Sequence, residues 1–571
     1  MGFEKIIGWT NKIKISFSQF LNRVMGKRFI SLAVILFWVT SLSAQNKAKL
    51  NPNIIIIMAD DLGYSDIGCF GGEISTPNLD RLSKGGLRMT NFYNNARCSP
   101  SRASLLTGQY AHKVGLASNG NSLTKNGITI AELLKENGYQ TGMVGKWHLS
   151  DDIQQSTKEE QLKWLNHQAY KDVDFASKES YPINRGFQKF YGIIWGVVNY
   201  FDPFSLVEGD KIIKEVPKDY YITDAINKKS IEFITNFTDQ HRPYFLYVAH
   251  TAPHWPIQAR EEDIIKYLDT YKMGWDELHK KRYEKMIRLG LINTSTTSFI
   301  DVMGNSGKWD NLSPLEKEKQ ARKMAVHAAM VSQLDLGVGE IIRKLEETKT
   351  LDNTLILFLA DNGASPEIPL NPGYDRPSQT REGIDLQYDN KVTVENIGSQ
   401  LSYTGIGQNW ANAANTPFRY WKMESFEGGL HTPLIIHWPN GLKRKKGTTS
   451  NALGHVSDIL PTIMDLNKLK YPNSFHENKL TPIDGVSILP IIQNKSEKGR
   501  DGIFFEHAKG KAFIKDDWKL VMKTNGSEWE LYQLSKDKNE TTNLAALKPE
   551  TVKIMRMAWE KWYAEMRTFY N

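Results

Sequence analysis

The stretch NIIIIMADD, residues 53–61, is a run of apolar residues, mostly isoleucine, that ends in two carboxylates. The run does not alternate between apolar and polar residues, which is typical of a strand buried on both faces of a parallel sheet. Three more runs have this form and also end in polar residues: QTGMVGKWH at 140–148, YFLYVAHTAPH at 244–254 and TLILFLADNG at 354–363. We therefore predict four buried strands.

Helical patterns lie between these runs, at 76–86, 129–139 and 328–349. Thr76 and Pro77 are typical of a helix start, and Gly138 is typical of a helix end. Strands that alternate with helices predict an α/β fold with a central, mostly parallel sheet flanked by helices. In such sheets the ligand crevice lies beyond the carboxyl ends of the strands, so the four polar strand ends predict one polar site.

Changes in composition and in the pattern of apolar residues divide the chain into three parts. We predict a leader at 1–44, a catalytic α/β domain at 45–466 and a smaller C-terminal α+β domain at 467–571. The last part contains GIFFEHAKGKAFIKDDWKLVMK and EWELYQLS, which favour an antiparallel sheet. Two stretches interrupt the α/β pattern and are predicted insertions, at about 259–327 and about 364–416.

The N-terminal segment resembles a secretory leader. Lys27 and Arg28 precede an apolar run at 29–39, which is too short to span a bilayer, and Ala44 ends the small, polar residues that follow. We expect a Sec signal peptide cleaved near Ala44, with Met25 as a second candidate start, and hence a periplasmic or secreted protein. A membrane anchor is the alternative reading of this run, and we expect no stable membrane span.

The net charge of the chain is unevenly distributed. Residues 1–44 carry six Lys and Arg against one Glu, so they hold +5 of the total of +8 and leave +3 for the rest. A surplus of this size does not indicate a nucleic-acid partner.

Carboxylates at two strand ends predict a metal site. Asp60 and Asp61 repel each other unless a cation lies between them. Two adjacent aspartates without further ligands are otherwise most simply part of a helix cap or a solvated turn. Asp361 and Asn362, at a second strand end, supply two more oxygen ligands of the kind that Ca²⁺ and Mg²⁺ prefer. The sequence has no cluster of Cys and His that would favour zinc.

Basic residues follow the same strands. Each of them alone is most simply a surface residue, but Lys146 and His148 come after one predicted strand and His254 comes after another. With Arg102 and Lys422 they would form a pocket for a tetrahedral oxyanion such as sulfate or phosphate.

Only two cysteines, Cys69 and Cys98, occur in the 571 residues. A single disulfide between them is one interpretation, because exported proteins often use disulfides. Cys98 lies in the polar segment CSPSRASLLTG, residues 98–108, where a buried structural thiol is not expected. The other interpretation is that Cys98 is kept for its chemistry.

The segment CSPSRASLLTG resembles the signature of the type I sulfatases, whose pattern is C-x-P-S-R-x-x-x-x-T-G. The resemblance extends over nearly all of residues 50–545, including ADDLGYSDIGCFGG, GKWH, APHWP, ADNG and FEGGLHTPLIIHWP. NYFDP and NTPFRYWK resemble the bacterial arylsulfatase-like branch of this family. The resemblance implies an alkaline-phosphatase-like fold and a cysteine that is oxidised to Cα-formylglycine (3-oxoalanine).

The resemblance also implies a role for each candidate residue. A Ca²⁺ ion, or Mg²⁺, would be bound by five residues: Asp60, Asp61, residue 98, Asp361 and Asn362. One hydroxyl of the formylglycine hydrate would attack sulfur, with Asp361 as base, and the other would later expel sulfate, with His148 taking its proton. Arg102 and Lys146 would hold the hydrate and the sulfate, while His254 and Lys422 would act at the leaving-group oxygen.

The predicted function is hydrolysis of sulfate esters, R–O–SO₃⁻ to R–OH and sulfate, on a sulfated carbohydrate. Alternatives are a small aryl sulfate as substrate, a phosphodiesterase or phosphonate monoester hydrolase of the same superfamily, and a glycan-binding protein without activity. A formylglycine-generating enzyme or an anaerobic sulfatase-maturating enzyme would be a partner. Asp202 and His507 are candidate substrate contacts, and His431 and Lys511 depart from the family pattern.

Overall fold

The computed structural model describes residues 51–168 and 173–570. The predicted leader at 1–44, with Met25 and Ala44, lies outside these residues. Among the residues that are described, no helix combines the length and the apolar character needed to cross a bilayer.

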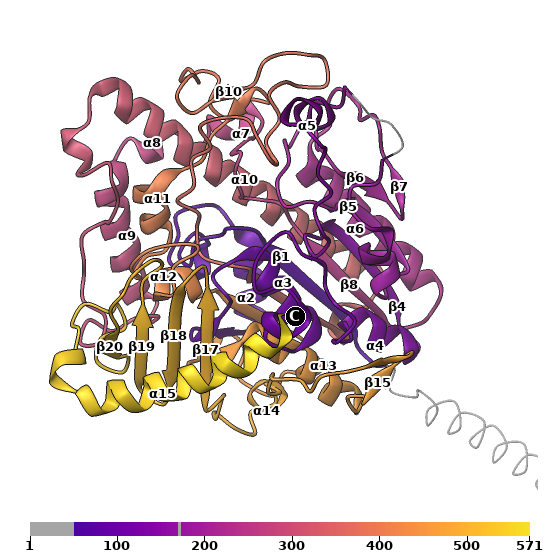
Figure 1. Cartoon of the computed structure of the whole chain (residues 1–571), viewed down its shortest axis with the longest axis vertical. Coiled ribbons are helices and arrows are strands. Elements are labelled where there is room, and N and C mark those ends of the chain that lie inside the picture. The colour runs from indigo at the N-terminus through magenta and orange to yellow at the C-terminus, as the bar shows by residue number, and fades with distance from the viewer. Residues whose placement is uncertain (1–50, 169–172, 571) are drawn as a thin grey trace, which may run out of the picture. The chain divides into compact units, whose positions relative to one another are not determined.

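The four predicted strands lie side by side in one ten-stranded sheet (Figure 1). β1 (Asn53–Ala59) is paired in parallel with β8 (Tyr244–Ala249) on one side and with β9 (Thr354–Ala360) on the other. β4 (Gln140–Lys146) is parallel to β8. The α/β prediction is confirmed, and the carboxyl ends of all four strands lie at the same edge of the sheet.

The remaining strands extend the sheet on both sides of this central group. β5 (Lys189–Ile193) is parallel to β4, whereas β12 (Leu434–His437) is antiparallel to β9. The outer strands are β2 (Leu87–Met89), β6 (Leu206–Glu208), β7 (Lys211–Ile212) and β13 (Thr448–Ser450).

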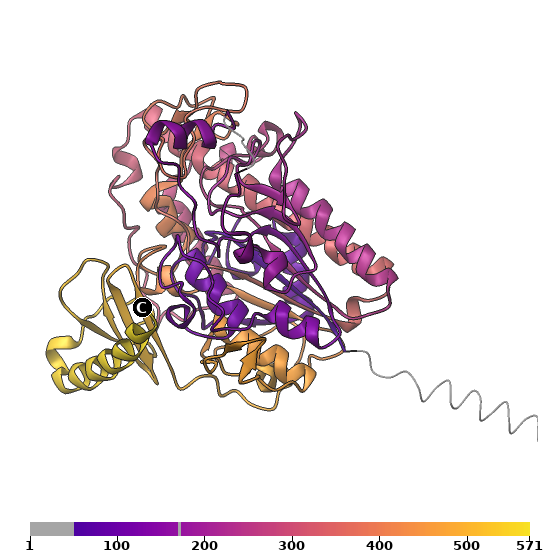
Figure 2. The same ribbon diagram turned by 45° about the vertical axis from the view of Figure 1, so that its right-hand side comes forward.

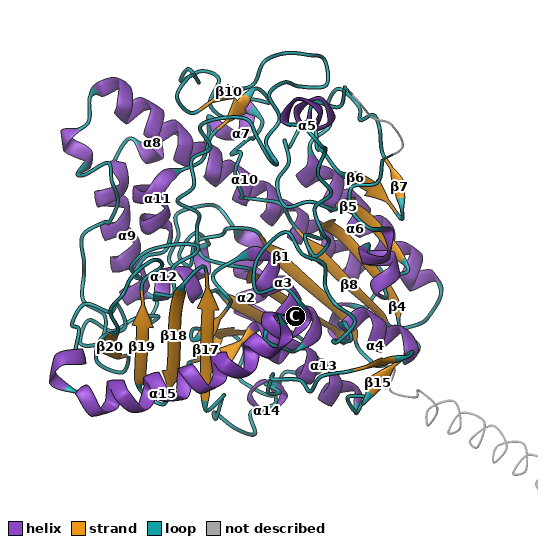
Figure 3. Cartoon of the chain, viewed as in Figure 1, coloured by secondary structure: helices purple, strands orange, loops and turns teal. Residues whose placement is uncertain are grey.

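Helices cover both faces of the sheet, as the apolar runs require (Figure 3). Ile55 and Ile57 of β1 belong to one apolar core, with α2 (Pro77–Gly85), α6 (Ile222–Asp239) and α10 (Pro314–Glu347). Ile54 and Ile56 belong to the other core, with α3 (Cys98–Thr107), α4 (Ile130–Glu136) and α13 (Ile459–Asn467). Every residue of β1 is buried, which accounts for its lack of alternation.

The predicted antiparallel sheet forms near the C-terminus and is confirmed. Its strands are β17 (Gly502–His507), β18 (Gly510–Lys515), β19 (Trp518–Met522) and β20 (Glu530–Gln533), and α15 (Pro549–Met566) packs on them (Figure 2). Leu480, Ile488 and Ile491, in the segment between 467 and 501, belong to the second core. This segment contains β15 (Ser474–Phe475), β16 (Asn478–Lys479) and α14 (Leu489–Ile492).

Both predicted insertions contain regular structure. The stretch 259–327 holds α7 (Glu261–Ile264), α8 (Leu268–Tyr271), α9 (Gly274–Arg288) and the start of α10. α10 begins earlier than expected because the Ser313 hydroxyl accepts a hydrogen bond from the Glu316 N–H and Pro314 occupies the first helical position. The stretch 364–416 holds β10 (Gln387–Tyr388), β11 (Ser402–Tyr403) and α11 (Gly407–Ala414). The other short elements are β3 (Phe92–Tyr93), β14 (Gly454–His455), α5 (Lys158–Leu165) and α12 (Glu427–Leu430).

Gly145 of β4 is a position that only glycine fits. Its φ is +102°, and a Cβ atom there would lie 1.9 Å from the backbone oxygen of Ala249 on the neighbouring strand β8. We predict that Gly145→Ala lowers the free energy of unfolding by about 3 kcal/mol or more, because overpacking adds to the backbone strain. It also lowers activity, because the next residue is Lys146. Chemical denaturation and initial rates measure both effects.

The matched control is Gly138→Ala. Gly138 also has a positive φ, +84°, but a Cβ there meets no atom within 4 Å. Only the strain of the left-handed backbone is then added, about 1–2 kcal/mol. Equal losses for the two variants would show that the contact with Ala249 is not the constraint.

Candidate active site

The predicted site residues come from different elements and meet at the carboxyl edge of the sheet. Residues at or just after the ends of β1, β4, β8 and β9 supply the carboxylates, Asn362 and three of the basic residues, α3 supplies two residues and the loop before α12 supplies one. All are buried: Asp60, Asp61, Cys98, Arg102, Lys146, His148, His254, Asp361, Asn362 and Lys422. Buried charges of this kind need partners.

Arg102 ties α3 to the ends of β9 and β4. Its Nε and Nη2 donate to Asp361 Oδ2 at 3.0 and 2.7 Å, and its Nη1 donates to the carbonyl oxygen of Lys146 at 2.9 Å. Burial would lower the pKa of Arg102, but the Asp361 carboxylate, together with Asp60 and other neighbours, raises it. Burial would raise the pKa of Asp361, but Arg102 and Lys146 together hold it below its usual value. Arg102 is therefore a fixed cation.

Lys146 and Lys422 each contact one carboxylate of the adjacent pair. Lys146 Nζ donates to Asp60 Oδ2 at 2.7 Å, and Lys422 Nζ donates to Asp61 Oδ2 at 2.9 Å. Lys422 Nζ also lies 3.1 Å from His254 Nε2. Burial would lower the pKa of Lys422, yet Asp61 and the other carboxylates raise it, so this lysine is charged.

The protonation of His254 follows from its contacts. Its Nδ1 lies 2.5 Å from the carbonyl oxygen of Trp255, which can only accept, so Nδ1 carries a proton. Burial and the Lys422 ammonium hold the pKa of His254 well below its usual value. The ring is therefore neutral, and Nε2 accepts a hydrogen bond from Lys422.

The donor set fits a hard divalent cation. Ligand atoms of Asp60, Asp61 and His254 lie within 4.8 Å of one another. Asp60 Oδ1 and Asn362 Oδ1 are buried, and neither has a hydrogen-bond partner among the described residues. Burial, and the neighbouring Asp361 and Asp61, raise the pKa of Asp60, a strain that a cation would relieve. Unpaired buried oxygens beside carboxylates are what Ca²⁺ and Mg²⁺ coordinate.

Cys98 is the first residue of α3 and lies at this site. The Asn119 side-chain amide is 3.8 Å from its Sγ, and Cys98 is close enough to Arg102 and Lys422 to influence the pKa of each. Cys98 and Cys69 are both free, so the alternative of a disulfide between them is not supported by the structure. The Ser99 hydroxyl donates to the carbonyl oxygen of His148 at 2.5 Å and so holds the start of α3 against the end of β4.

His148 is held in a left-handed backbone conformation, with φ of +55°. Burial and the Lys146 ammonium hold the pKa of His148 well below its usual value, so the ring is neutral. A neutral imidazole can take up a proton.

The two candidate substrate contacts differ in their surroundings. Asp202 accepts hydrogen bonds from the backbone N–H and Nε of Arg381, both at 3.0 Å, and in the described part of the chain it forms no hydrogen bond or ion pair with a predicted catalytic residue. His507, at the end of β17, has its Nδ1 3.3 Å from the carbonyl oxygen of Ala117, in the segment that also supplies Asn119. Burial, with a contribution from Arg97, lowers the pKa of His507 to about 4. Lys511 points elsewhere, since its Nζ lies 5.0 Å from the centre of the Trp559 ring.

Sequence reasoning missed Glu367 and Arg97. Glu367 Oε2 lies 3.0 Å from Lys422 Nζ and accepts a hydrogen bond from the Trp255 indole at 3.1 Å. Its other oxygen is 3.7 Å from Arg97 Nη1. Glu367 lies in the stretch 364–416, which has no periodic pattern that could reveal it, whereas the position of Arg97 next to Cys98 was a usable signal.

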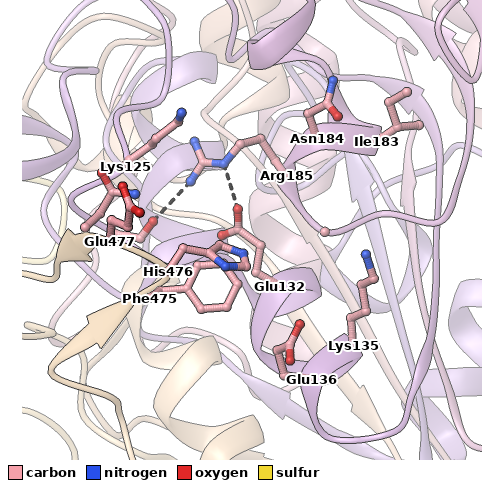
Figure 4. A pocket seen from close by; sticks show the side chains of 13 residues that line it. Lys125, Glu132, Lys135, Glu136, Ile183, Asn184, Arg185, Phe475, His476 and Glu477 are labelled. Atoms are coloured by element: carbon pink, nitrogen blue, oxygen red, sulfur yellow. Dashed lines mark hydrogen bonds and ion pairs between the residues drawn. The ribbon is translucent and has the colours of Figure 1, made fainter.

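A cavity of about 710 Å³ lies away from these residues (Figure 4). It is lined by Lys125, Lys135, Phe475 and others, and the Arg185 Nε in its wall donates to Glu132 at 2.9 Å. None of the predicted site residues lines this cavity.

The family comparison agrees with this geometry. The sulfatase family matches residues 52–469, and the family described as N-sulphoglucosamine sulphohydrolase, C-terminal, matches residues 419–567. The chain belongs to the sulfatase family. This family, part of the alkaline phosphatase superfamily, uses a metal ion and formylglycine, and the enzyme is a sulfuric ester hydrolase.

Relatives of known name share most of the length of this sulfatase. An uncharacterized sulfatase of Schizosaccharomyces pombe is 32% identical, over 90% of this chain and 94% of its own. An arylsulfatase of Klebsiella aerogenes is 30% identical, over 83% and 99%. An N-acetylglucosamine-6-O-sulfatase of Bacteroides thetaiotaomicron is 24% identical, over 88% and 84%. The crystal structure of Ps i-CgsB has the same fold, with a TM-score of 0.61 over 90% of this chain and 92% of its own at 24% identity.

Glu367 supports a prediction about Lys422 in this sulfatase. Glu367→Gln keeps the shape of the side chain but removes the charge that Lys422 and Arg97 face. We expect kcat/KM for para-nitrophenyl sulfate to fall about 10- to 100-fold, the usual effect of losing an orienting partner. Ser365→Ala is the control, because it removes the hydrogen bonds of the Ser365 hydroxyl to the carboxylate and the backbone N–H of Glu367 but leaves the charge of Glu367 in place. A Glu367→Gln enzyme that is as active as wild type would contradict the assignment.

Proposed function

We propose that this sulfatase acts on a sulfated carbohydrate. The proposal is supported by the N-acetylglucosamine-6-O-sulfatase among its relatives and by the match to an N-sulphoglucosamine sulphohydrolase C-terminal region. A small aryl sulfate is the second candidate substrate, supported by the arylsulfatase of Klebsiella aerogenes among the relatives. The main support for sulfate chemistry is that three buried cations, Arg102, Lys146 and Lys422, converge on the carboxylates at the strand ends, Asp361, Asp60 and Asp61 respectively.

We further propose that residue 98 is formylglycine in the active enzyme and that the ion is Ca²⁺. Cys98 lies within the motif that carries the family resemblance, and its side chain lies among cations rather than apolar residues. Asp60, Asp61, residue 98, Asp361 and Asn362 would hold the ion. Ca²⁺ suits a buried cage of several protein oxygens better than Mg²⁺, which keeps much of its water.

The two groups supply different chemistry. The ion would supply positive charge that polarises the sulfate, and the aldehyde hydrate would supply a nucleophile with a second hydroxyl for release. Arg102 and Lys146 would hold the negative charge of the sulfate oxygens in a site closed to water. Asp361, which already accepts from Arg102, is the base nearest the end of β9.

The neutral histidines suit the proton transfers. His254 presents Nε2 toward Lys422, so the pair can deliver a proton to the leaving-group oxygen. His148 is neutral and can take a proton from the second hydroxyl. A phosphodiesterase or phosphonate monoester hydrolase would use a similar pocket, and only relative rates on the two ester types separate them.

We propose that the enzyme is exported to the periplasm or secreted after residue 98 has been oxidised by a formylglycine-generating enzyme or an anaerobic sulfatase-maturating enzyme. The support is the sequence pattern at 1–44 together with CSPSRASLLTG.

One test of the proposed function compares ester classes. Enzyme co-expressed with a maturation system is expected to release sulfate from para-nitrophenyl sulfate and from at least one sulfated mono- or disaccharide. It is expected to cleave the matched phosphodiester much more slowly. Cys98→Ala is expected to reduce all turnover to background while the thermal unfolding transition is kept.

Mass spectrometry of the peptide that contains residue 98 accompanies these assays. An aldehyde or its hydrate is expected in active enzyme. If fully active enzyme contains nothing but unmodified cysteine at position 98, the assignment of formylglycine as the nucleophile is wrong. If the phosphodiester is turned over faster than the sulfate ester, sulfate ester hydrolysis is not the natural reaction.

Another test concerns the ion. Prolonged treatment with EDTA is expected to lower kcat by more than about 10-fold, because removal of the ion takes away the positive charge that the carboxylates bind. Ca²⁺ is expected to restore the rate better than Mg²⁺, and the metal content is measured in parallel. Full activity in enzyme shown to be metal-free would exclude the site described above.

A further inference from the structure

A second group of buried charges lies outside the active site, between the α/β part and the C-terminal sheet. It consists of Glu427 of α12, His431 just after α12, Lys519 of β19 and Glu540, and we call it the Glu427 cluster. None of the four is more than 4% exposed. Charged groups buried this deeply are stable only when their charges balance.

Lys519 joins the two carboxylates of the cluster. Its Nζ lies 2.7 Å from Glu427 Oε1 and 2.7 Å from Glu540 Oε1. The backbone N–H of Glu427 donates to Glu540 Oε2 at 2.8 Å. Burial raises the pKa of Glu540 to about 7, although Lys519 and the N–H of Glu427 favour its ionised form. When both carboxylates are ionised, the single ammonium between them leaves a net charge of −1 that another group must neutralise.

His431 faces an acceptor on each side of its ring. Its Nε2 lies 2.9 Å from the backbone carbonyl oxygen of Thr90, which can only accept, so Nε2 carries a proton. Its Nδ1 lies 2.7 Å from Glu427 Oε2. Since a neutral imidazole has only one N–H, a second donation from Nδ1 to an ionised Glu427 requires the doubly protonated ring.

The alternative is a neutral ring beside a protonated Glu427, and the surroundings of that carboxylate disfavour it. Oε2 also accepts a hydrogen bond from the Tyr93 hydroxyl at 2.8 Å, and Oε1 faces Lys519. Burial would raise the pKa of Glu427, but Lys519 and His431 lower it to about 2. A carboxylate with three such donors is ionised.

The rings around His431 also suit a cation. The imidazole stacks on Phe418 with ring centres 4.5 Å apart and planes 4° from parallel, and Tyr93 lies 4.5 Å away. Tyr64 approaches edge-on at 5.2 Å. Aromatic faces stabilise a desolvated cation.

The cluster is connected to the active site through short backbone segments. The hydroxyl of Thr432, next to His431, donates to the carbonyl oxygen of Ala360 and accepts from its N–H, and Asp361 follows directly. On the other side, the N–H of Gly428 donates to the carbonyl oxygen of Arg419, which closes the loop that carries Lys422. The N–H of Met423 in this loop donates to the carbonyl oxygen of Ala96, two residues before Cys98.

We propose that His431 is a buried imidazolium that, with Lys519, balances Glu427 and Glu540 and so positions the Lys422 loop and the end of β9. His431 is thus a positioning residue, and the role rests on the proposed action of Lys422 at the leaving-group oxygen. The C-terminal sheet contributes to the site through Lys519, although it supplies none of the predicted catalytic residues.

The protonation is tested directly on the full-length enzyme labelled with nitrogen-15 histidine. At neutral pH the two ring nitrogens of His431, identified by their loss in His431→Gln, are both expected to carry protons. A ring with one unprotonated nitrogen would overturn the proposal. This measurement does not depend on activity, so it stands even if the enzyme cleaves no sulfate ester.

The positioning role is tested with charge variants. His431→Gln leaves the cluster at −1 and Glu427→Gln leaves it at +1, and each is expected to lower kcat about 10- to 100-fold. The double variant is neutral again and is expected to be more active than either single variant. Wild-type activity in Glu427→Gln would overturn the proposal, because the amide imitates a protonated Glu427.

Leaving groups separate positioning from a general loss of structure. If Lys422 is displaced, the single variants are expected to lose more activity on phenyl sulfate than on para-nitrophenyl sulfate, because the poorer leaving group needs the proton more. An equal loss on both substrates would refute the positioning role. Failure of the mature wild-type enzyme to release sulfate from any ester, aryl or carbohydrate, would instead refute the proposed function.

Discussion

The parallel pairing of β1 with β9 is the interaction on which the rest of the site depends. Ala59 lies opposite Ala360, so Asp60 and Asp61 leave the sheet beside Asp361 and Asn362. Like charges brought this close in a buried place would destabilise the fold by several kcal/mol unless they were compensated. The strand pairing thus places mutually repelling carboxylates at one edge of the sheet, and the surrounding elements supply the basic side chains that compensate them.

The compensation is a one-to-one match of charges, all of them buried except Arg97 and Glu367, which are partly exposed. The carboxylates are Asp60, Asp61, Asp361 and Glu367, and the cations are Arg97, Arg102, Lys146 and Lys422. Because these charges already cancel, a divalent ion bound by the carboxylates would leave the site positive. A positive, water-excluded pocket favours a sulfate ester, which carries one negative charge, and disfavours neutral esters.

The sequence revealed the parts of this arrangement that follow from strand pattern and missed those that depend on packing. The four strand runs and their polar ends could be read because a strand buried on both faces has a distinctive composition. Glu367 could not be found, because it reaches Lys422 from a long segment without periodicity. His250 and His254 follow the same strand, yet burial lowers the pKa of His250 to about 3 and neither of its ring nitrogens has a partner among the described residues. Only the fold distinguishes this buried histidine from His254, which contacts Lys422.

The C-terminal sheet also contributes a buried charge near the site. A domain that packed on the α/β part only through apolar contacts could be lost with a cost in stability alone. Lys519, however, places a buried charge against Glu427, four residues before His431 and five after Lys422. Removing Lys519 would leave Glu427 and Glu540 without their shared counter-ion. Backbone hydrogen bonds join Gly428, next to Glu427, to the loop that carries Lys422, and join this loop to Ala96, two residues before Cys98. The geometry of the sulfate pocket therefore depends on a residue that the pocket does not contain.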